Sequence, residues 1–271
     1  MSAATPPTVG VFGGSGLYAL IDGAEWVTVD TPYGPPSDAI AVGTVGGRRV
    51  AFLPRHGRDH TIPPHRINYR ANGWALRALG VRRVLAPCAV GSLQAALAPG
   101  HMVVPDQFVD RTRGRLDTYW EGPVVGHIGA ADPYCPELRA QAVALARRTD
   151  VPVHDHGTLV VIQGPRFSTR AESRWFAEAG WDVVGMTGYP EGILARELGL
   201  CYAALCLVTD YDAGLEGSPE VAPVSHRQVL EVFAANIDRV RRLLLELVTV
   251  VSDTPGCGCG AAPAAAGVAD G

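Results

Sequence analysis

The chain has 271 residues, of which 47% are hydrophobic, so it is long enough to build one large α/β domain with a sizeable core. Its net charge of −4 does not provide the basic stripe that sequence-independent nucleic-acid binding needs, so any anion must be held by a local site. The N-terminus lacks a charged segment followed by an apolar run, and no apolar run reaches the roughly 20 residues that span a bilayer. We therefore expect a cytoplasmic protein without a nucleic-acid or membrane partner.

Short apolar runs recur along the chain and predict strands. They lack the alternation of a half-exposed strand, which favours burial on both faces of a sheet. The predicted strands are Val9–Phe12, Val50–Leu53, Arg83–Ala86, Met102–Val104, Leu159–Ile162, Asp182–Val184 and Ala203–Val208.

Helical patterns separate these strands. A capping box predicts a helix start at Thr169, and a second one at Ser225 opens a long amphipathic helix. The predicted helices cover residues 68–79, 170–176, 190–198 and a long segment from 226. Alternating strands and helices predict an α/β fold, a single domain with a mixed, mostly parallel twisted sheet flanked by helices.

Both ends of the chain are rich in small residues and proline. We expect a disordered N-terminus over residues 1–7, one domain over residues 8–250 and a disordered tail over residues 251–271, because such composition buries little apolar surface. Within the tail, Cys257 and Cys259 form a pair that suits a metal or a strained disulfide. No second cysteine or histidine pair lies beside it in sequence, so we expect no metal site.

Four motifs with polar or small residues follow predicted strands. Gly13-Gly14-Ser15-Gly16 suits an anion-binding loop or a tight turn, and Arg55-His56-Gly57 suits a phosphate site or an ordinary surface ion pair. Phe167, after the Leu159–Ile162 strand, can stack on a flat ring or fill the core. Thr209-Asp210-Tyr211-Asp212 offers two carboxylates, for acid catalysis, a metal or a solvated turn.

Taken together and in order, the motifs resemble the family of trimeric purine nucleoside phosphorylases, with 5′-methylthioadenosine phosphorylases as the nearest branch. The resemblance covers roughly residues 8–250. The segments that carry it are Gly13–Tyr18, Thr31–Gly34, Arg55–Gly57, Asn68–Asn72, Gly164–Glu172, Met186–Glu191 and Thr209–Asp212.

The resemblance implies a pentosyltransferase that splits a nucleoside with inorganic phosphate as co-substrate. It implies no cofactor and no metal, and a homotrimer with shared active sites. Position by position, the resemblance implies that phosphate is bound by Ser15, Arg55, His56, Ala89 and Thr187. It implies that Met186 binds the ribose and that the base is bound by Phe167, Ser168, Asp210 and Asp212. The implied 5′ pocket is made by His226, Val229 and His127 of a neighbouring subunit. Asp210 and His56 are the implied catalytic residues.

The preferred nucleoside remains open between several substrates. Asp210 can accept from a 6-amino group, and Ser168 stands where the 6-oxopurine branch has glutamate, so the resemblance favours 5′-methylthioadenosine. His226 instead suits a polar 5′ group, which favours adenosine or another 5′-substituted 5′-deoxyadenosine. A 6-oxopurine nucleoside is a further alternative. Cys88 departs from the threonine that is frequent in the methylthioadenosine branch at the phosphate.

Overall fold

A computed structural model describes residues 5–14, 21, 23–123, 125–214 and 224–267, without the side chains of residues 226, 228 and 233. Its strands form one mixed, mostly parallel sheet, which confirms the predicted fold class. The strands are β1 (Val9–Gly13), β2 (Glu25–Val27), β3 (Ile40–Val45), β4 (Arg48–Pro54), β5 (Arg83–Ser92), β6 (Met102–Val103), β7 (Gln107–Arg111), β8 (Val153–His154), β9 (Thr158–Ile162), β10 (Val183–Gly185) and β11 (Cys201–Asp210). Every strand predicted from an apolar run is present.

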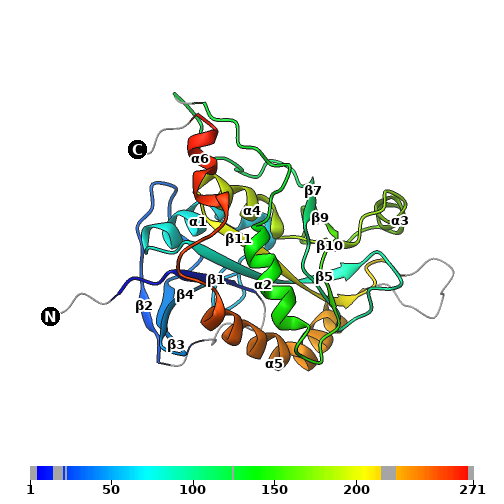
Figure 1. Ribbon diagram of the computed structural model, residues 1–271. Coiled ribbons are helices and arrows are strands. Elements are labelled where there is room, and N and C mark those ends of the chain that lie inside the picture. Colours follow the sequence, from blue (N-terminus) through cyan, green and yellow to red (C-terminus); the bar gives the residue numbers. More distant parts are fainter. Residues whose placement is uncertain (1–4, 15–20, 22, 124, 215–223, 268–271) are drawn as a thin grey trace.

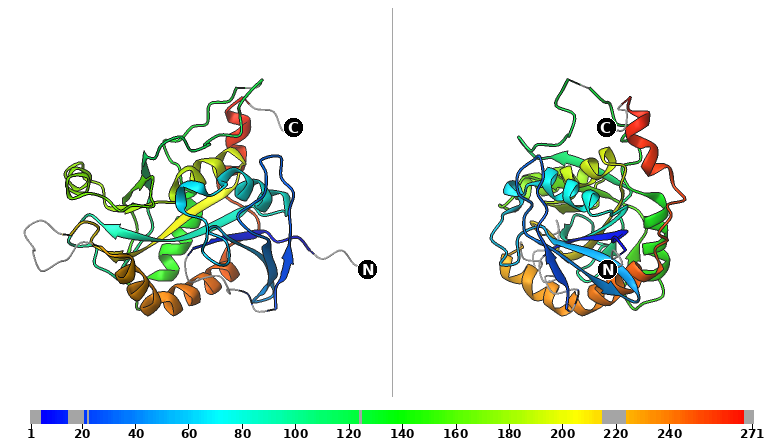
Figure 2. Two further views of the ribbon diagram at one scale, coloured as in Figure 1. Left: turned by 180° about the vertical axis from the view of Figure 1, so that it is seen from behind. Right: turned by 90° about the vertical axis from the view of Figure 1, so that its left-hand side faces the viewer.

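The helices cover both faces of this sheet, as Figures 1 and 2 show. They are η1 (Pro64–Arg66), α1 (Tyr69–Ala78), α2 (Pro136–Ala146), α3 (Arg170–Glu178), α4 (Gly188–Glu197), α5 (His226–Val250), η2 (Gly258–Ala261) and α6 (Ala262–Ala265). The capping box at Thr169 is present. The helix α2 was missed because the apolar residues Ala140 and Ala144 stand on its exposed side, which weakens the helical periodicity.

Successive side chains of the central strands enter two separate cores. Val9 and Val11 of β1 face the core that α2 and α5 complete, whereas Phe12 faces the core that lies under α1 and α4. This alternation, together with the absence of exposed residues in β1 and β11, is expected of strands that are covered on both faces. None of the described helices has both the length and the apolar character needed to cross a membrane.

The strand β5 is the point at which the sheet divides. Its first residues pair in parallel with β1, and almost its whole length pairs in parallel with β11. Its last residues, Gly91 and Ser92, pair antiparallel with β10. Because β10 runs in the opposite direction, the chain leaves β10 towards the middle of β5, so residues after β10 come to lie near the middle of β5 and the residues that follow β4.

The chain after α5 differs from the predicted tail. Residues 251–267 form a connection, the short helices η2 and α6 and a contact between α6 and α4. Val251 and Cys259 are buried in the main core. The expectation of disorder from residue 251 onwards is therefore wrong for these residues, because composition did not reveal the cysteine contacts and the Asp253 and Thr254 hydrogen bonds that tie them to the domain. Residues 1–4 and 268–271 lie outside the described residues.

Candidate functional site

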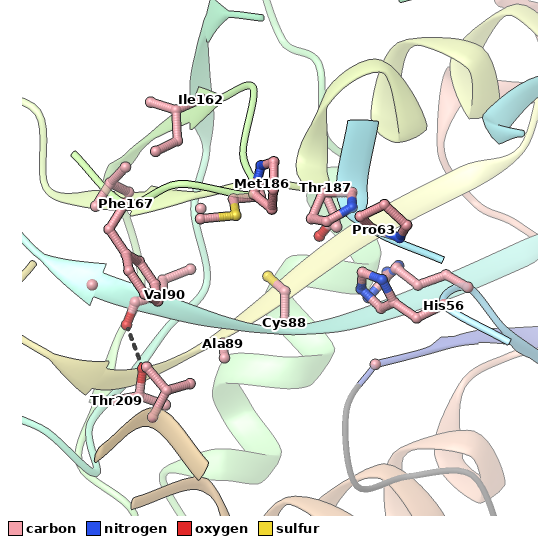
Figure 3. A pocket seen from close by; sticks show the side chains of 18 of the residues that line it. His56, Pro63, Cys88, Ala89, Val90, Ile162, Phe167, Met186, Thr187 and Thr209 are labelled. Atoms are coloured by element: carbon pink, nitrogen blue, oxygen red, sulfur yellow. Dashed lines mark hydrogen bonds between the residues drawn. The ribbon is translucent and has the colours of Figure 1, made fainter. Parts of the chain in front are cut away.

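A cavity of about 340 Å³ lies where β1, β4, β5, β9, β10 and β11 end. Figure 3 shows the labelled side chains around it, with His56 and Pro63 at one end, Phe167 at the other, and Cys88, Ala89 and Val90 of β5 between them. Gly14, Arg55, Met186, Thr187, Asp210, Asp212 and Val229 also line the cavity. Most side chains that were predicted from separate motifs therefore meet in one place.

Arg55 lies at one end of the cavity and is almost fully buried, with 1% of its surface exposed. Its Nε and Nη2 atoms donate to Glu191 at 2.9 and 2.6 Å, and its Nη1 atom donates to the Pro87 carbonyl oxygen at 2.8 Å. Burial alone would lower the pKa of Arg55, but the Glu191 carboxylate outweighs it and raises the pKa above its ordinary value. The guanidinium is thus a fixed positive charge. Nη1 and Nη2 each keep one hydrogen that makes none of these bonds, and these hydrogens can be donated to a ligand.

His56 lies next to Arg55 and is a neutral imidazole. Its Nδ1 atom lies 2.8 Å from the Ile62 carbonyl oxygen, which can only accept, so Nδ1 carries the hydrogen. Burial lowers the pKa of His56 to about 4, and the neighbouring charge of Arg55 acts in the same direction. The Nε2 atom is therefore an acceptor near neutral pH, so His56 suits a protonated phosphate oxygen, from which it can also take up the proton.

Asp210 and Asp212 stand at another side of the cavity, at the end of β11. Asp210 is 3% exposed and accepts from the Asp212 amide at 2.8 Å and from the Thr209 hydroxyl at 2.6 Å. Burial raises the pKa of Asp210 to about 6. Asp212 is 2% exposed, burial raises its pKa, and its Oδ2 atom has no hydrogen-bond partner among the described residues. Two buried acids with acceptor capacity left over are a site for a ligand that offers N–H donors.

The close approach of the two acids to β5 requires a glycine at position 91. A Cβ atom on Gly91 would lie 2.9 Å from the Asp210 Oδ1 atom and 3.1 Å from the Asp212 Cβ atom. The first distance is shorter than real Cβ contacts and the second is tighter than most of them, so a side chain at this position would displace the acids from the strand.

The remaining predicted residues divide into those that line the cavity and those that do not. Ala89, Phe167, Met186, Thr187 and Val229 line it. The Ser168 hydroxyl is buried without a geometric hydrogen bond among the described residues, although it is near enough to Asp212 to lower the pKa of that carboxyl.

Ser168 does not line the cavity, and three further predicted residues cannot be placed in it. Ser15 lies outside the described residues, and so does the side chain of His226, whose backbone begins α5. His127 is exposed, and its amide donates to the Ala266 carbonyl oxygen at 3.4 Å. It does not line the cavity of its own chain, so its predicted reach into a neighbouring subunit stays a prediction.

Glu191 was not predicted as a part of the site, whereas the density of histidine and proline in residues 60–65 predicts a shaped segment near it. Glu191 is 3% exposed and also accepts from the Tyr202 hydroxyl at 2.8 Å. Its charge is balanced by a residue 136 positions away, so no local pattern points to it. The dense histidines and prolines of residues 60–65 were the one available signal, and residues 60–64 line the cavity.

Comparison with known proteins agrees with this arrangement. Residues 8–249 match the phosphorylase superfamily. The chain is 58% identical over 264 residues to a purine nucleoside phosphorylase of Streptomyces coelicolor, covering 94% of this chain and 93% of the relative. It is 57% identical over 244 residues to an S-methyl-5′-thioadenosine phosphorylase of Mycolicibacterium smegmatis, covering 90% and 91%. The structure of a Schistosoma mansoni methylthioadenosine phosphorylase in complex with adenine superposes with a TM-score of 0.89 at 39% identity and covers 96% of each chain.

Proposed function

The chain belongs to the phosphorylase superfamily, and from this premise we propose that it splits 5′-methylthioadenosine with phosphate into adenine and 5-methylthioribose 1-phosphate. It is a pentosyltransferase, and several relatives that are 46–57% identical carry the name S-methyl-5′-thioadenosine phosphorylase. The observation that carries the proposal is the arrangement of opposite charges in one cavity: a fixed cation at Arg55, and two buried acids at Asp210 and Asp212.

The Arg55 end of the cavity holds phosphate in the proposed complex. Arg55, the Gly14 and Ala89 segments and Thr187 surround this end, and His56 contributes a ring nitrogen that accepts from a protonated phosphate oxygen. Ser15 is assigned to the same anion by its sequence position. Phosphate then attacks C1′ of the ribose as the bond from C1′ to the purine breaks, and Met186 lies against the sugar. Holding both reactants in one cavity lowers the entropic part of the barrier.

The acidic end of the cavity holds the purine. Phe167 stacks on the ring, and Asp210 accepts a hydrogen bond from the 6-amino group. As the base departs with the bonding electron pair, the carboxylic acid form of Asp210 donates its proton to N7 and becomes a carboxylate. A pKa of about 6 suits this role, because an acid works best when its pKa is near the working pH. Asp212 and Ser168 complete the contacts to the base.

The 5′ side of the substrate decides between the candidate nucleosides. Val229 and Leu230 of α5 bring apolar surface to the cavity, which favours a methylthio group. His226 favours a 5′-hydroxyl, as in adenosine, and His127 of a neighbouring subunit reaches this pocket in the proposed homotrimer. The Streptomyces coelicolor relative, named purine nucleoside phosphorylase, keeps adenosine or a 6-oxopurine nucleoside as the alternative. Inorganic phosphate is a co-substrate, the reaction itself uses no metal or cofactor, and we place the enzyme in the cytoplasm.

One experiment tests substrate and reaction together. The purified enzyme is assayed with methylthioadenosine, adenosine and inosine, each with and without phosphate, and the sugar product is identified. We expect the highest kcat/KM with methylthioadenosine, a strict need for phosphate and a pentose 1-phosphate product. A strong preference for inosine would refute the adenine assignment, negligible turnover of methylthioadenosine would refute the proposed substrate, and release of free pentose would make the enzyme a hydrolase.

A further inference from the structure

Four of the six cysteines gather on the face of the sheet that α2 and α5 cover. They come from three separate parts of the chain: Cys135 precedes α2, Cys201 begins β11, and Cys257 and Cys259 lie in the segment that follows α5. Their sulfur atoms all lie within 4.8 Å of one another. Cys135, Cys201 and Cys259 are buried in the main core, and Cys257 packs against it. None of the four lines the cavity described above.

The spacing of these sulfur atoms fits ligands around one ion. The sulfur of Cys257 lies 3.5 Å from that of Cys135 and 3.3 Å from that of Cys201, and all six cysteines are present as free thiols. A disulfide needs about 2.05 Å between its sulfur atoms. Four thiolates at about 2.3 Å from a tetrahedral zinc ion lie about 3.8 Å apart, close to the contacts here. We propose that Cys135, Cys201, Cys257 and Cys259 bind one Zn²⁺ ion in a closed structural site.

A buried cation beside the cluster supports this proposal independently. Arg83 is fully buried, and it lies directly opposite Cys201 in the parallel pairing of β5 and β11, so the two side chains leave the sheet on the same face. Its Nη2 atom donates to Glu137 and to the Thr254 carbonyl oxygen, but its Nε and Nη1 atoms have no acceptor among the described residues. Four thiolates around Zn²⁺ carry a net charge of −2, and such a group stabilises a neighbouring guanidinium with unused donors.

The backbone around the cluster is held in position by further hydrogen bonds. The Leu138 amide, in the first turn of α2, donates to the Cys135 sulfur at 3.4 Å. The Gly256 amide donates to Glu137 at 2.8 Å, immediately before Cys257. These contacts bring the Cys257-Gly258-Cys259 segment against α2 and β11, where Figure 1 shows the chain passing α2 on its way from α5 to α6. Two ligands separated by one glycine then chelate the ion from one side and Cys135 and Cys201 from the other.

The proposed site explains why a segment of such composition is ordered. Its glycines and alanines bury little apolar surface, so core packing alone contributes little to holding residues 256–266. A zinc ion that joins this segment to β11 and α2 contributes binding free energy directly to the folded state. The ion is structural, and the phosphorolysis proposed above does not pass through it.

The zinc content of the purified enzyme tests the proposal. The full chain is produced with zinc in the medium, purified without chelators and examined by elemental analysis. We expect about one zinc ion per chain, as four cysteines fill one tetrahedral site. Replacement of the ion by Co²⁺ is expected to produce the visible absorption bands of a tetrahedral cobalt thiolate. Cys257→Ser and Cys259→Ser are expected to lose the metal, whereas Cys206→Ala is expected to keep it, because Cys206 lies on the same strand as Cys201 but outside the cluster.

Several results would overturn the proposal. One is a metal-free enzyme whose intact mass is lower by four hydrogen atoms, since this mass identifies two disulfides among the same cysteines. Another is a metal-free enzyme with reduced thiols that does not take up Zn²⁺ or Co²⁺. Zinc retained after both Cys257 and Cys259 are replaced would place the metal elsewhere. The cobalt spectrum is measured on the wild-type chain, so the test does not depend on the folding of any variant or on which nucleoside the enzyme uses.

Discussion

Replacing Asp210 by Asn is expected to separate 6-amino from 6-oxo purine substrates while the fold stays intact. The side-chain amide fits the contacts already present. Its oxygen keeps the bond from the Asp212 amide at 2.8 Å, and its NH₂ group donates to the Thr209 hydroxyl, which lies 2.6 Å from the carboxylate oxygen. Thr209 then donates to the Val90 carbonyl oxygen, at 3.2 Å. No buried polar atom loses its partner, so a change in activity reflects the altered hydrogen bonds to the substrate and not unfolding of the enzyme.

The size of the effect follows from the hydrogen bonds that change. A carboxyl group can accept from the 6-amino group and donate to N7, whereas an amide cannot supply the ionisable proton and presents a donor where an acceptor is needed. One unsatisfied buried bond costs about 1–3 kcal/mol, or roughly 5- to 150-fold in kcat/KM. With a 6-oxopurine the amide NH₂ group can donate to the carbonyl oxygen, so a smaller loss is expected.

The assay is kcat/KM for methylthioadenosine and inosine across the pH range, for the wild type and Asp210→Asn. In the wild type, the acid form of Asp210 disappears as the pH rises through about 6, so kcat/KM for methylthioadenosine falls above that value. The variant lacks this limb. An equal loss on both substrates, or an unchanged limb in the variant, would refute the assignment of Asp210 as the group that reads and protonates the base. A lowered melting temperature would instead indicate a packing defect.

Three other substitutions test the cavity. Glu191→Gln leaves Arg55, which is 1% exposed, without a carboxylate partner, so urea denaturation should show a loss of about 3–5 kcal/mol. The pKa of His56 is about 4 in the native protein and about 6.5 in the unfolded chain, so the unfolded chain binds the proton first and the stability of the wild type falls as the pH drops from about 6.5 to 4. In His56→Asn the free energy of unfolding should depend less on pH over this range. Gly91→Ala should displace Asp210 and lower kcat/KM by roughly 100-fold with unchanged circular dichroism.

Matched controls separate these effects from general damage. Glu231→Gln removes an exposed ion pair with Arg227 and should change stability by less than about 1 kcal/mol. Gly129→Ala adds a methyl group where no atom lies within 4 Å, so activity should stay at the wild-type level. If Glu191→Gln and Glu231→Gln lost the same free energy of unfolding, burial of the ion pair between Arg55 and Glu191 would make no difference to stability. Full activity of Gly91→Ala would show that the acids need no close approach to β5.

The predicted strands and some of the cavity residues could be found from local sequence patterns, whereas Ala89, Thr187, Met186 and Val229 were implied only by the family resemblance. Apolar runs without alternation identify β1, β4, β5 and β11, because a strand covered on both faces leaves no polar positions. The motifs after these strands supplied Arg55, His56, Asp210 and Asp212. The short strands β2 and β8 gave no such signal, since Glu25 and His154 are polar and neither strand forms an apolar run.

The amino-acid sequence by itself determined which chemical groups are available: a guanidinium beside an imidazole, two acids at a strand end, and a pair of cysteines near the C-terminus. Only the tertiary structure decided the charge of each group and which groups come together. Burial and a distant Glu191 make Arg55 a fixed cation, and burial makes His56 neutral and Asp210 a weak acid. The antiparallel entry of β10 brings Thr187 to the same cavity, and the fold sets Cys135 and Cys201 beside Cys257. Charge state and ligand geometry depend on neighbours within a few ångströms, and some of these neighbours, such as Glu191 for Arg55 and Cys201 for Cys257, are more than fifty residues away in sequence.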